Sequence, residues 1–250
     1  MATNTLWEWF ESPLGQYLLE QERAYLDEVT PDIFGFHAIQ VGMPEVDLLR
    51  ENRITHKLRV AREGSPDTFA RCTELPFATH SIDLVVLPHV LEFAEEPHAV
   101  LREVDRVMMP EGRLLIVGYN PGSLWGLRSS LGPSRDEHPW NGRFLSLLRV
   151  KDWLALLGFD VSAGRLIAYA PPFDNERVRR RFAFMEPAGD RWWAVGGAVY
   201  MLQAVKRVRG MRLITPAWQE KSARDKALIA AAKREGHGAA KPAAHLRVVK

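Results

Sequence analysis

The chain has 250 residues, of which 46% are hydrophobic and 26% charged, and its formal net charge is +2. The hydrophobic fraction can fill a core, which excludes a disordered chain, and the small net charge gives no argument for nucleic acid. The single cysteine, Cys72, excludes an internal disulfide framework and a zinc site built from several cysteines. This length predicts one large domain or two small ones.

We expect neither a targeting segment nor a membrane-spanning segment. Residues 1–10 lack a basic stretch and carry Glu8 within their only apolar run, so they do not resemble a signal peptide. The longest uncharged apolar stretch, residues 192–205, is too short to span a bilayer and is better interpreted as a buried strand. We therefore expect a soluble, cytoplasmic protein.

The first part of the chain predicts helices followed by two strands. Apolar side chains recur near helical spacing: Trp7, Phe10, Leu14, Tyr17, Leu18 and Tyr25. Because Pro13 interrupts this pattern, we expect a short helix and then a longer one. A strand over residues 36–41 ends at Gly42, and Pro44 suits the first position of a short helix over residues 45–51. Residues 57–61 form a weak strand.

Strands and helices then alternate along the chain. The fully apolar run at residues 84–87 is typical of a parallel strand that is buried on both faces. Residues 97–109 are amphipathic and end at a Pro-Glu-Gly turn, and residues 114–119 form a second apolar strand. A helix over residues 150–157 and strands that begin at residues 159 and 194 complete the pattern. The alternation predicts a mostly parallel sheet with helices on both faces.

The last segment differs in composition from the rest. Residues 219–250 hold eight basic and three acidic residues and no aromatic residue. We interpret this segment as a flexible cationic tail that aids solubility, with an RNA-binding arm as the alternative. The predicted organisation is a helical segment over residues 1–30, a domain over residues 31–215 and a basic tail over residues 216–250.

Short motifs occur in a fixed order between residues 75 and 125. They are Leu75-Pro76-Phe77, Ser81-Ile82-Asp83, His89-Val90-Leu91-Glu92-Phe93, Pro97-His98, Leu101-Arg102-Glu103-Val104 and Met109-Pro110-Glu111-Gly112. With this set, which covers about a fifth of the chain, the sequence resembles the class I S-adenosylmethionine-dependent methyltransferases, specifically those with a type 11 methyltransferase domain.

The resemblance implies a Rossmann-like α/β fold, with strands 84–87 and 114–119 beside strand 36–41 at the centre of the sheet. It implies S-adenosylmethionine as the cofactor, bound at the carboxyl ends of the strands. The cofactor-binding positions that it indicates are Gln40, Gly42 and Met43 at the methionine portion, Thr73, Glu74 and Leu75 at the adenine, and Pro88 and His89 nearby.

The turn after the first strand departs from the family pattern. Gly42 stands where the family has its first glycine, but Pro44 and Val46 occupy the second and third glycine positions. Gln40 replaces a frequent acid, and Arg71 replaces an acid that commonly bonds the adenine amino group. Three features of the cofactor site are therefore altered together.

The second crossover of the predicted sheet is unusually short. Only six residues separate the strand at 57–61 from any strand at 68–72. A parallel crossover that includes a helix needs about a dozen residues or more, so one crossover helix is predicted to be missing. Glu63 follows the weak strand and is a candidate for the acid that bonds the ribose, with an exposed loop glutamate as the alternative.

Several residues at the predicted strand ends are candidates for chemistry. His89 is a candidate general base or cofactor contact, with capping of the following turn as the alternative. Tyr119 and Asn120 follow the next strand and, with Trp125, are candidates for lining an acceptor site. Packing is the alternative role for Trp125.

Three further sequence features bear on function. Pro171-Pro172-Phe173, together with Trp192-Trp193, predicts either a lid or a hydrophobic corner. The cluster Arg177, Arg179, Arg180 and Arg181 could recognise a phosphate or a carboxylate, and a solvated helix face is the alternative. No metal site is expected, because the histidines lack ligand spacing, and no phosphate-binding Gly-Lys-Ser/Thr loop occurs.

Two functions remain open. The first is an S-adenosylmethionine-dependent methyltransferase with a small-molecule acceptor, an activity that depends on alignment and on exclusion of water. The second is a catalytically inactive methyltransferase-like fold that serves as a binding or regulatory module. The altered turn, Arg71 and the short crossover motivate this second hypothesis.

Overall fold

The computed structural model describes residues 6–131, 137–173 and 196–207, together with residues 177, 181, 182, 184–186 and 189. The predicted basic tail, Trp192, Trp193, Arg179 and Arg180 lie outside the described residues. None of the helices within the described part is both long and apolar enough to cross a membrane.

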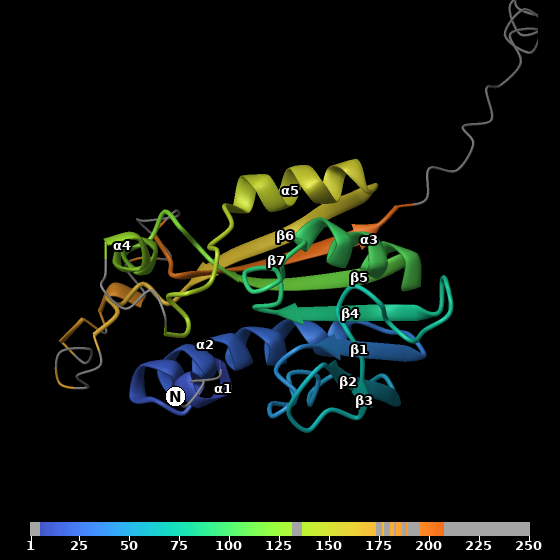
Figure 1. The fold of residues 1–250 in the computed structure, drawn as a ribbon, viewed down its shortest axis with the longest axis horizontal. Coiled ribbons are helices and arrows are strands. Elements are labelled where there is room, and N and C mark those ends of the chain that lie inside the picture. The colour runs from blue at the N-terminus through green and yellow to red at the C-terminus, as the bar shows by residue number, and fades with distance from the viewer. Residues whose placement is uncertain are drawn as a thin grey trace, which may run out of the picture. The chain divides into compact units, whose positions relative to one another are not determined.

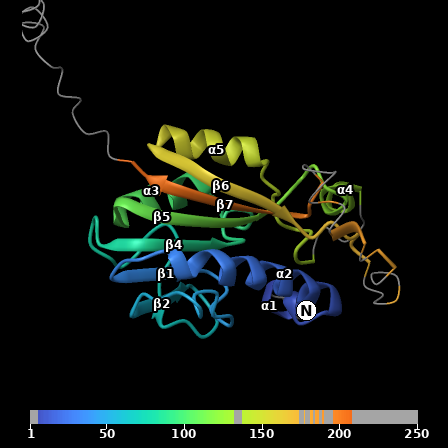
Figure 2. The ribbon, with the colours of Figure 1, turned by 180° about the vertical axis from the view of Figure 1, so that it is seen from behind.

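A seven-stranded sheet forms the centre of the molecule. Its strands are β1 (His37–Val41), β2 (His56–Ala61), β3 (Thr68–Phe69), β4 (Ile82–Pro88), β5 (Met108–Tyr119), β6 (Phe159–Ile167) and β7 (Val199–Lys206). The spatial order is β3-β2-β1-β4-β5-β7-β6, which can be followed from the front in Figure 1 and from behind in Figure 2. All neighbours pair in parallel except β7, which runs antiparallel to both β5 and β6. The predicted α/β class and the central strands are confirmed.

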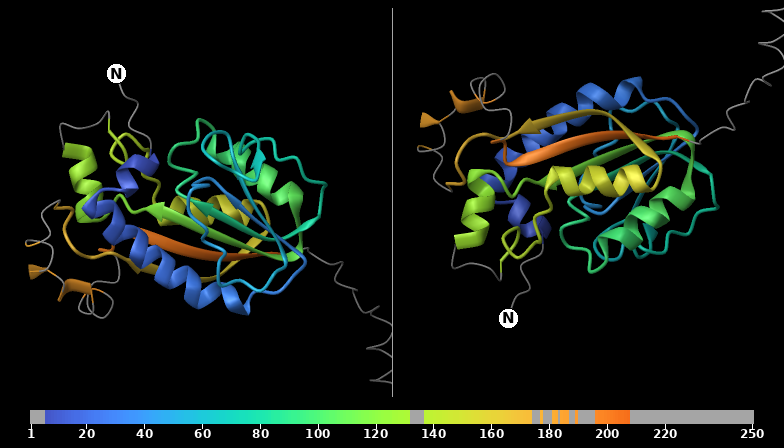
Figure 3. Two further views of the ribbon diagram at one scale, coloured as in Figure 1. Left: turned by 90° about the horizontal axis from the view of Figure 1, so that it is seen from below. Right: turned by 90° about the horizontal axis from the view of Figure 1, so that it is seen from above.

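Helices cover both faces of this sheet. The helices of the described part are α1 (Leu6–Phe10), α2 (Pro13–Val29), the 3-10 turn η1 (Thr30–Asp32), α3 (Pro97–Val107), α4 (Leu124–Leu131) and α5 (Leu147–Leu156). Figure 3 shows α2 on one face and α3 and α5 on the other, and α1 and α4 lie beyond the ends of the strands (Figure 1). Each face has its own apolar core, because successive side chains of a buried strand point to opposite faces.

The N-terminal helices follow local sequence signals. Ser12 caps α2 and accepts a hydrogen bond from the Gly15 N–H at 3.1 Å, while Pro13 occupies the first helical turn. Leu14, Leu18 and other apolar residues of α2 then face the sheet. The short and the longer predicted helix are both present.

Neither of the first two crossovers contains a helix. The link from β2 to β3 has none, as its length predicted, but the helix predicted over residues 45–51 is wrong, because that segment is a series of turns. The Asp47 carboxylate accepts the Leu49 N–H at 2.9 Å, and Gln40 binds further backbone groups of the segment. Side chains thus satisfy backbone groups that a helix would have paired.

Other side chains hold the same loop to its surroundings. The buried Asn52 amide donates to the carbonyls of Thr30 at 2.6 Å and Ile33 at 3.0 Å. Lys57 donates to the carbonyl of Leu49 at 3.0 Å and to that of Asn52 at 3.2 Å. The loop between β1 and β2 is therefore anchored without regular secondary structure.

Candidate functional site

A cavity of about 260 Å³ lies at the carboxyl ends of β1, β2 and β4. Its lining consists of Leu6, Val41, Gly42, Met43, Ala61, Arg62, Ala70, Cys72, Pro88, His89, Val90, Phe93, Ala94 and His138. Four of the positions predicted for cofactor binding, namely Gly42, Met43, Pro88 and His89, are thus brought together. The carboxyl edge of a parallel sheet is where α/β proteins bind their ligands.

Gly42 allows the backbone to turn closely along the cavity wall. Its φ of +89° lies in the left-handed region, and an added Cβ would stand 2.9 Å from a methyl carbon of Val90. Met43 follows with a φ of +47°. Glycine is the residue that adopts such a turn without strain, so Gly42 is placed as a ligand-facing turn requires.

Gln40 lies behind this wall and is not among the lining residues. Its side-chain nitrogen donates to the carbonyls of Gly42, Met43 and Val46 at 3.1, 2.8 and 2.9 Å, and its oxygen accepts the Leu48 N–H at 3.0 Å. The amide is fully buried. The Gln40 side chain therefore stabilises the turn after β1 through hydrogen bonds to its backbone.

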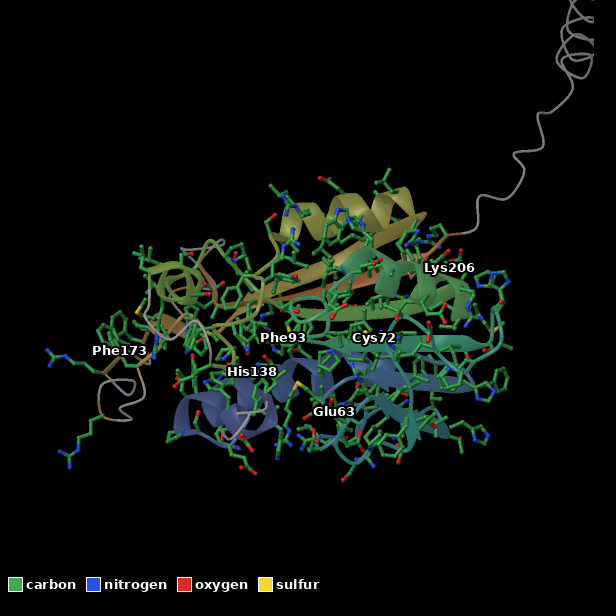
Figure 4. All side chains as sticks on the ribbon, viewed as in Figure 1. Glu63, Cys72, Phe93, His138, Phe173 and Lys206 are labelled. Carbon is green, nitrogen blue, oxygen red and sulfur yellow. The ribbon has the colours of Figure 1, made fainter. Side chains whose placement is uncertain are left out.

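The end of β2 places a cation, Arg62, at the cavity, and not the candidate acid Glu63. Arg62 lines the cavity next to the end of β2, whereas Glu63 is exposed and is not part of the lining. Figure 4 shows Glu63 apart from Phe93 and His138. None of the described lining residues is a carboxylate.

The segment predicted to border the adenine lies just beyond the cavity. Cys72 lines the cavity, but Thr73, Glu74 and Leu75 do not. The Glu74 N–H donates to the Arg71 carbonyl at 3.0 Å, and the Leu75 N–H donates to the Glu103 carboxylate at 2.7 Å. These contacts fix the chain that carries Cys72, whose pKa is raised by burial.

Two aromatic rings from distant segments complete the wall. Phe93 and His138 have ring centroids 4.9 Å apart, and Figure 4 shows them side by side. Leu6, from α1, lines the same cavity. Leu6 and His138 belong to none of the sequence motifs, so no local pattern predicted them at this cavity.

A buried polar cluster of Glu22, His89, Glu92 and Tyr119 lies directly behind the cavity wall. The His89 Nε2 is 2.8 Å from the Glu22 Oε1, and its Nδ1 is 3.4 Å from the Glu92 Oε1. The Glu92 Oε1 also accepts the Tyr119 N–H at 2.7 Å, and the Tyr119 ring stacks on His89 at 4.2 Å. Both ring nitrogens of His89 are thus engaged by carboxylates.

This environment sets the charge of His89. Burial opposes the protonated ring, but the charges and hydrogen bonds of Glu22 and Glu92 outweigh it and raise the pKa of His89 to about 9. Burial, assisted by the two carboxylates, raises the pKa of Tyr119 well above its ordinary value. At neutral pH the cluster therefore contains an imidazolium and a neutral phenol.

The three residues predicted for acceptor binding lie at or just after the end of β5 and make structural contacts there. Tyr119 is fully buried in the cluster, and the Asn120 side chain donates to the Gly197 carbonyl at 2.9 Å. The Trp125 indole donates to the Ala170 carbonyl at 2.9 Å. None of the three lines the cavity at β1, β2 and β4.

A second, larger depression lies beside α4. It measures about 780 Å³ and is lined by Leu124, Leu127, Arg128, Leu131, Pro171, Pro172, Phe173 and Phe182. The predicted corner at residues 171–173 is part of it. Among the described residues, no group of three or more His, Cys, Asp or Glu side chains is placed to hold a metal ion.

Comparison with known proteins links this architecture to one family. Residues 45–116 match the family described as a methyltransferase domain. An uncharacterised protein of Escherichia coli, YafS, is 35% identical over 155 residues, which are 61% of this chain and 65% of that protein. The chain thus spans slightly less than two thirds of this relative.

Solved structures of low sequence identity share the fold. An S-adenosylmethionine-dependent methyltransferase from Thermotoga maritima matches with a TM-score of 0.56 at 14% identity, over 75% of this chain and 90% of that one. A second one, from Archaeoglobus fulgidus, matches with a TM-score of 0.54 at 19% identity, over 76% and 94%. These likenesses establish the class I methyltransferase fold.

Proposed function

Since the chain carries a methyltransferase domain in a class I methyltransferase fold, we propose that it is an S-adenosylmethionine-dependent methyltransferase that acts on a small-molecule acceptor. The observation that carries this proposal is the cavity at the carboxyl ends of β1, β2 and β4, with Gly42 in its wall. Its lining is mostly apolar with a few polar groups, as in small-molecule sites generally.

The residues present fit the cofactor at three places. The left-handed turn at Gly42 leaves space that a Cβ would take, which suits close approach of the methionine portion. Arg62 at the end of β2 would donate to the ribose oxygens. The small or apolar side chains of Ala70, Cys72 and Phe93 would pack against the adenine.

When bound, the cofactor supplies a methyl group that is already activated on a sulfonium. The protein's tasks are then to orient the acceptor and to exclude water. His89 would contact the cofactor from the cavity wall. At neutral pH it is protonated and both of its nitrogens face carboxylates, so it holds a proton and does not accept one. Tyr119 and Asn120, at the end of β5, remain our proposed border of the acceptor site.

Calorimetric titration of the full chain with S-adenosylmethionine and S-adenosylhomocysteine tests this proposal. We compare the wild type with Gly42→Ala and with a matched control, Gly158→Ala. Gly158 has a φ of +84°, close to that of Gly42, and an added Cβ would meet only ordinary contacts. It precedes β6 at the opposite edge of the sheet. Both variants therefore strain the backbone by about 1–2 kcal/mol, but only one alters the cavity.

We expect binding by the wild type and by Gly158→Ala, and a loss of about tenfold or more in Gly42→Ala, which corresponds to about 1.4 kcal/mol. Equal affinities in the two variants would contradict a cofactor seated on this turn. Absence of binding to the wild type at millimolar ligand would overturn the proposed activity.

The second candidate is a methyltransferase-like fold that has lost catalysis and serves as a binding module. Two observations favour it. The Gln40 side-chain amide is hydrogen-bonded to carbonyls of its own loop, and the described cavity lining contains the cation Arg62 and no carboxylate. A wild type that binds neither cofactor form would support this alternative.

A further inference from the structure

His138 lines the cavity from a segment that lies between the cavity and the end of β5. In this segment, residues 137–145, the Phe144 ring stacks on the Tyr119 ring with 4.8 Å between the centroids. Cys72 lines the cavity from the other side of the strand order, because it follows β3. His138 therefore reaches the cavity from the side of our proposed acceptor border.

Four residues of the described lining carry groups that bind protons: Arg62, Cys72, His89 and His138. The Arg62 guanidinium stays charged in proteins, and burial raises the pKa of Cys72, so that this residue is a thiol at neutral pH. Both ring nitrogens of His89 are engaged by carboxylates. His138 is thus the group of the described lining that can accept a proton at neutral pH.

The His138 ring is neutral at pH 7, because burial lowers its pKa and no carboxylate of the described lining stabilises the protonated form. Its Nδ1 is buried and has no hydrogen-bond partner within the described chain. Since Nδ1 is buried, Nε2 is the ring nitrogen that a molecule in the cavity can reach. In a neutral ring Nε2 accepts a hydrogen bond when Nδ1 carries the hydrogen.

We propose that His138 is the general base for the methyl acceptor, and that the acceptor's nucleophile is an O–H or N–H group. This inference rests on the proposed methyltransferase function. The proton moves from the acceptor to Nε2 while the acceptor's lone pair bonds to the methyl carbon, and the electron pair of the broken carbon–sulfur bond stays on sulfur. The positive charge thus passes from the sulfonium to the His138 imidazolium, which then releases its proton to water.

Histidine-ring NMR of the full-length wild type tests the position of the ring without any acceptor. S-adenosylmethionine and S-adenosylhomocysteine differ by one methyl group and its positive charge. A sulfonium within about 6 Å disfavours the imidazolium, so the pKa of His138 should be lower by about one unit or more in the S-adenosylmethionine complex. His37 and His56 lie at the opposite, amino ends of β1 and β2, so their resonances should be the same in both complexes.

The wild type alone decides this first test, so the result does not depend on whether a variant folds. Equal pKa values of His138 in the two complexes would overturn this inference and leave the proposed function intact. A His138 ring that titrates at or above pH 6.5 in the free protein would do the same. Absence of binding by both ligands would overturn the inference and the proposed function together.

A pH profile separates a base from a structural residue. We compare kcat/KM of the wild type, His138→Gln and the exposed control His56→Gln, with a phenol that the wild type methylates. The wild-type rate should rise through the pKa of His138 and then level off, and His56→Gln should follow it. His138→Gln should lose about a hundredfold or more at neutral pH and recover as the phenol itself ionises. A loss of the same size at every pH would show a structural role and overturn the inference.

Discussion

The pairing of His89 with two carboxylates predicts how the stability of the protein depends on pH. The pKa of His89 is raised from 6.5 to about 9 in the folded chain, and the ring is fully buried. The folded protein therefore keeps a proton that the unfolded chain releases above pH 6.5. The stabilisation from this proton is complete below pH 6.5 and is lost as the pH rises through 9.

The size of the effect follows from the difference between the two pKa values. Each pKa unit corresponds to about 1.4 kcal/mol, so the free energy of unfolding should fall by about 2–3 kcal/mol between pH 7 and pH 9. The His89→Gln variant lacks the proton and should lack this part of the slope. Its absolute stability is expected to be lower, because Glu22 and Glu92 then face each other without a cation.

Urea unfolding at several pH values between 7 and 9 measures this slope in the wild type and in His89→Gln. Other groups that titrate in this range are common to both proteins, so the difference between the two slopes isolates His89. Proton NMR of the histidine rings gives a direct check. Equal slopes, or a His89 ring that titrates near pH 6.5, would refute the reasoning.

Three further predictions concern single side chains. Cys72 is the only thiol of the chain and lines the cavity, so saturating S-adenosylhomocysteine should slow its reaction with a thiol reagent, and an unchanged rate would argue against a ligand in this cavity. Asp83→Ala removes the acceptor of the two backbone N–H groups at residues 36–37, at 2.8 and 3.0 Å, and should lower the free energy of unfolding in urea by about 2 kcal/mol. Gly118→Ala places a Cβ 2.3 Å from the Tyr200 hydroxyl, so the free energy of unfolding should fall by about 1–3 kcal/mol, with a lower midpoint in thermal unfolding. An unchanged midpoint would mean that the Tyr200 ring moves aside without cost.

The strands that matter most were predictable because their signals are local. The runs at residues 84–87 and 114–119 are apolar at every position or nearly so, and the structure buries them in β4 and β5. The length of the second crossover likewise excluded a helix by simple geometry. Pattern and chain length thus predicted the strands, but not that β7 runs antiparallel between β5 and β6.

The first crossover was mispredicted because its structure depends on a side chain outside the segment. Pro44 suits a helix start, but Gln40 donates to the Met43 and Val46 carbonyls and thereby competes with helical hydrogen bonds. Within residues 45–51 only Asp47, which accepts the Leu49 N–H, indicates such competition. The hydrogen bonds of the buried Gln40 amide in β1 outweighed the local helix propensity of the segment.

The candidate site was predictable only in part, for a related reason. Gly42 and His89 follow strands and could be placed at the carboxyl edge from the topology. Glu22 reaches His89 from a helix that precedes the sheet, and in the sequence it is one charge on an amphipathic helix. A contact between residues far apart in the sequence produces no periodic pattern, so sequence periodicity could not predict it.

The position of β7 has a consequence for the order of assembly. Residues 199–206 pair with β5 on one side and with β6 on the other, so an interior strand of the sheet is made after both of its neighbours. While a ribosome is still short of residue 199, β5 has an open edge and β6 has no partner strand. Closure of the sheet must therefore wait for late synthesis, and a chain truncated before that point would expose an apolar edge that favours aggregation.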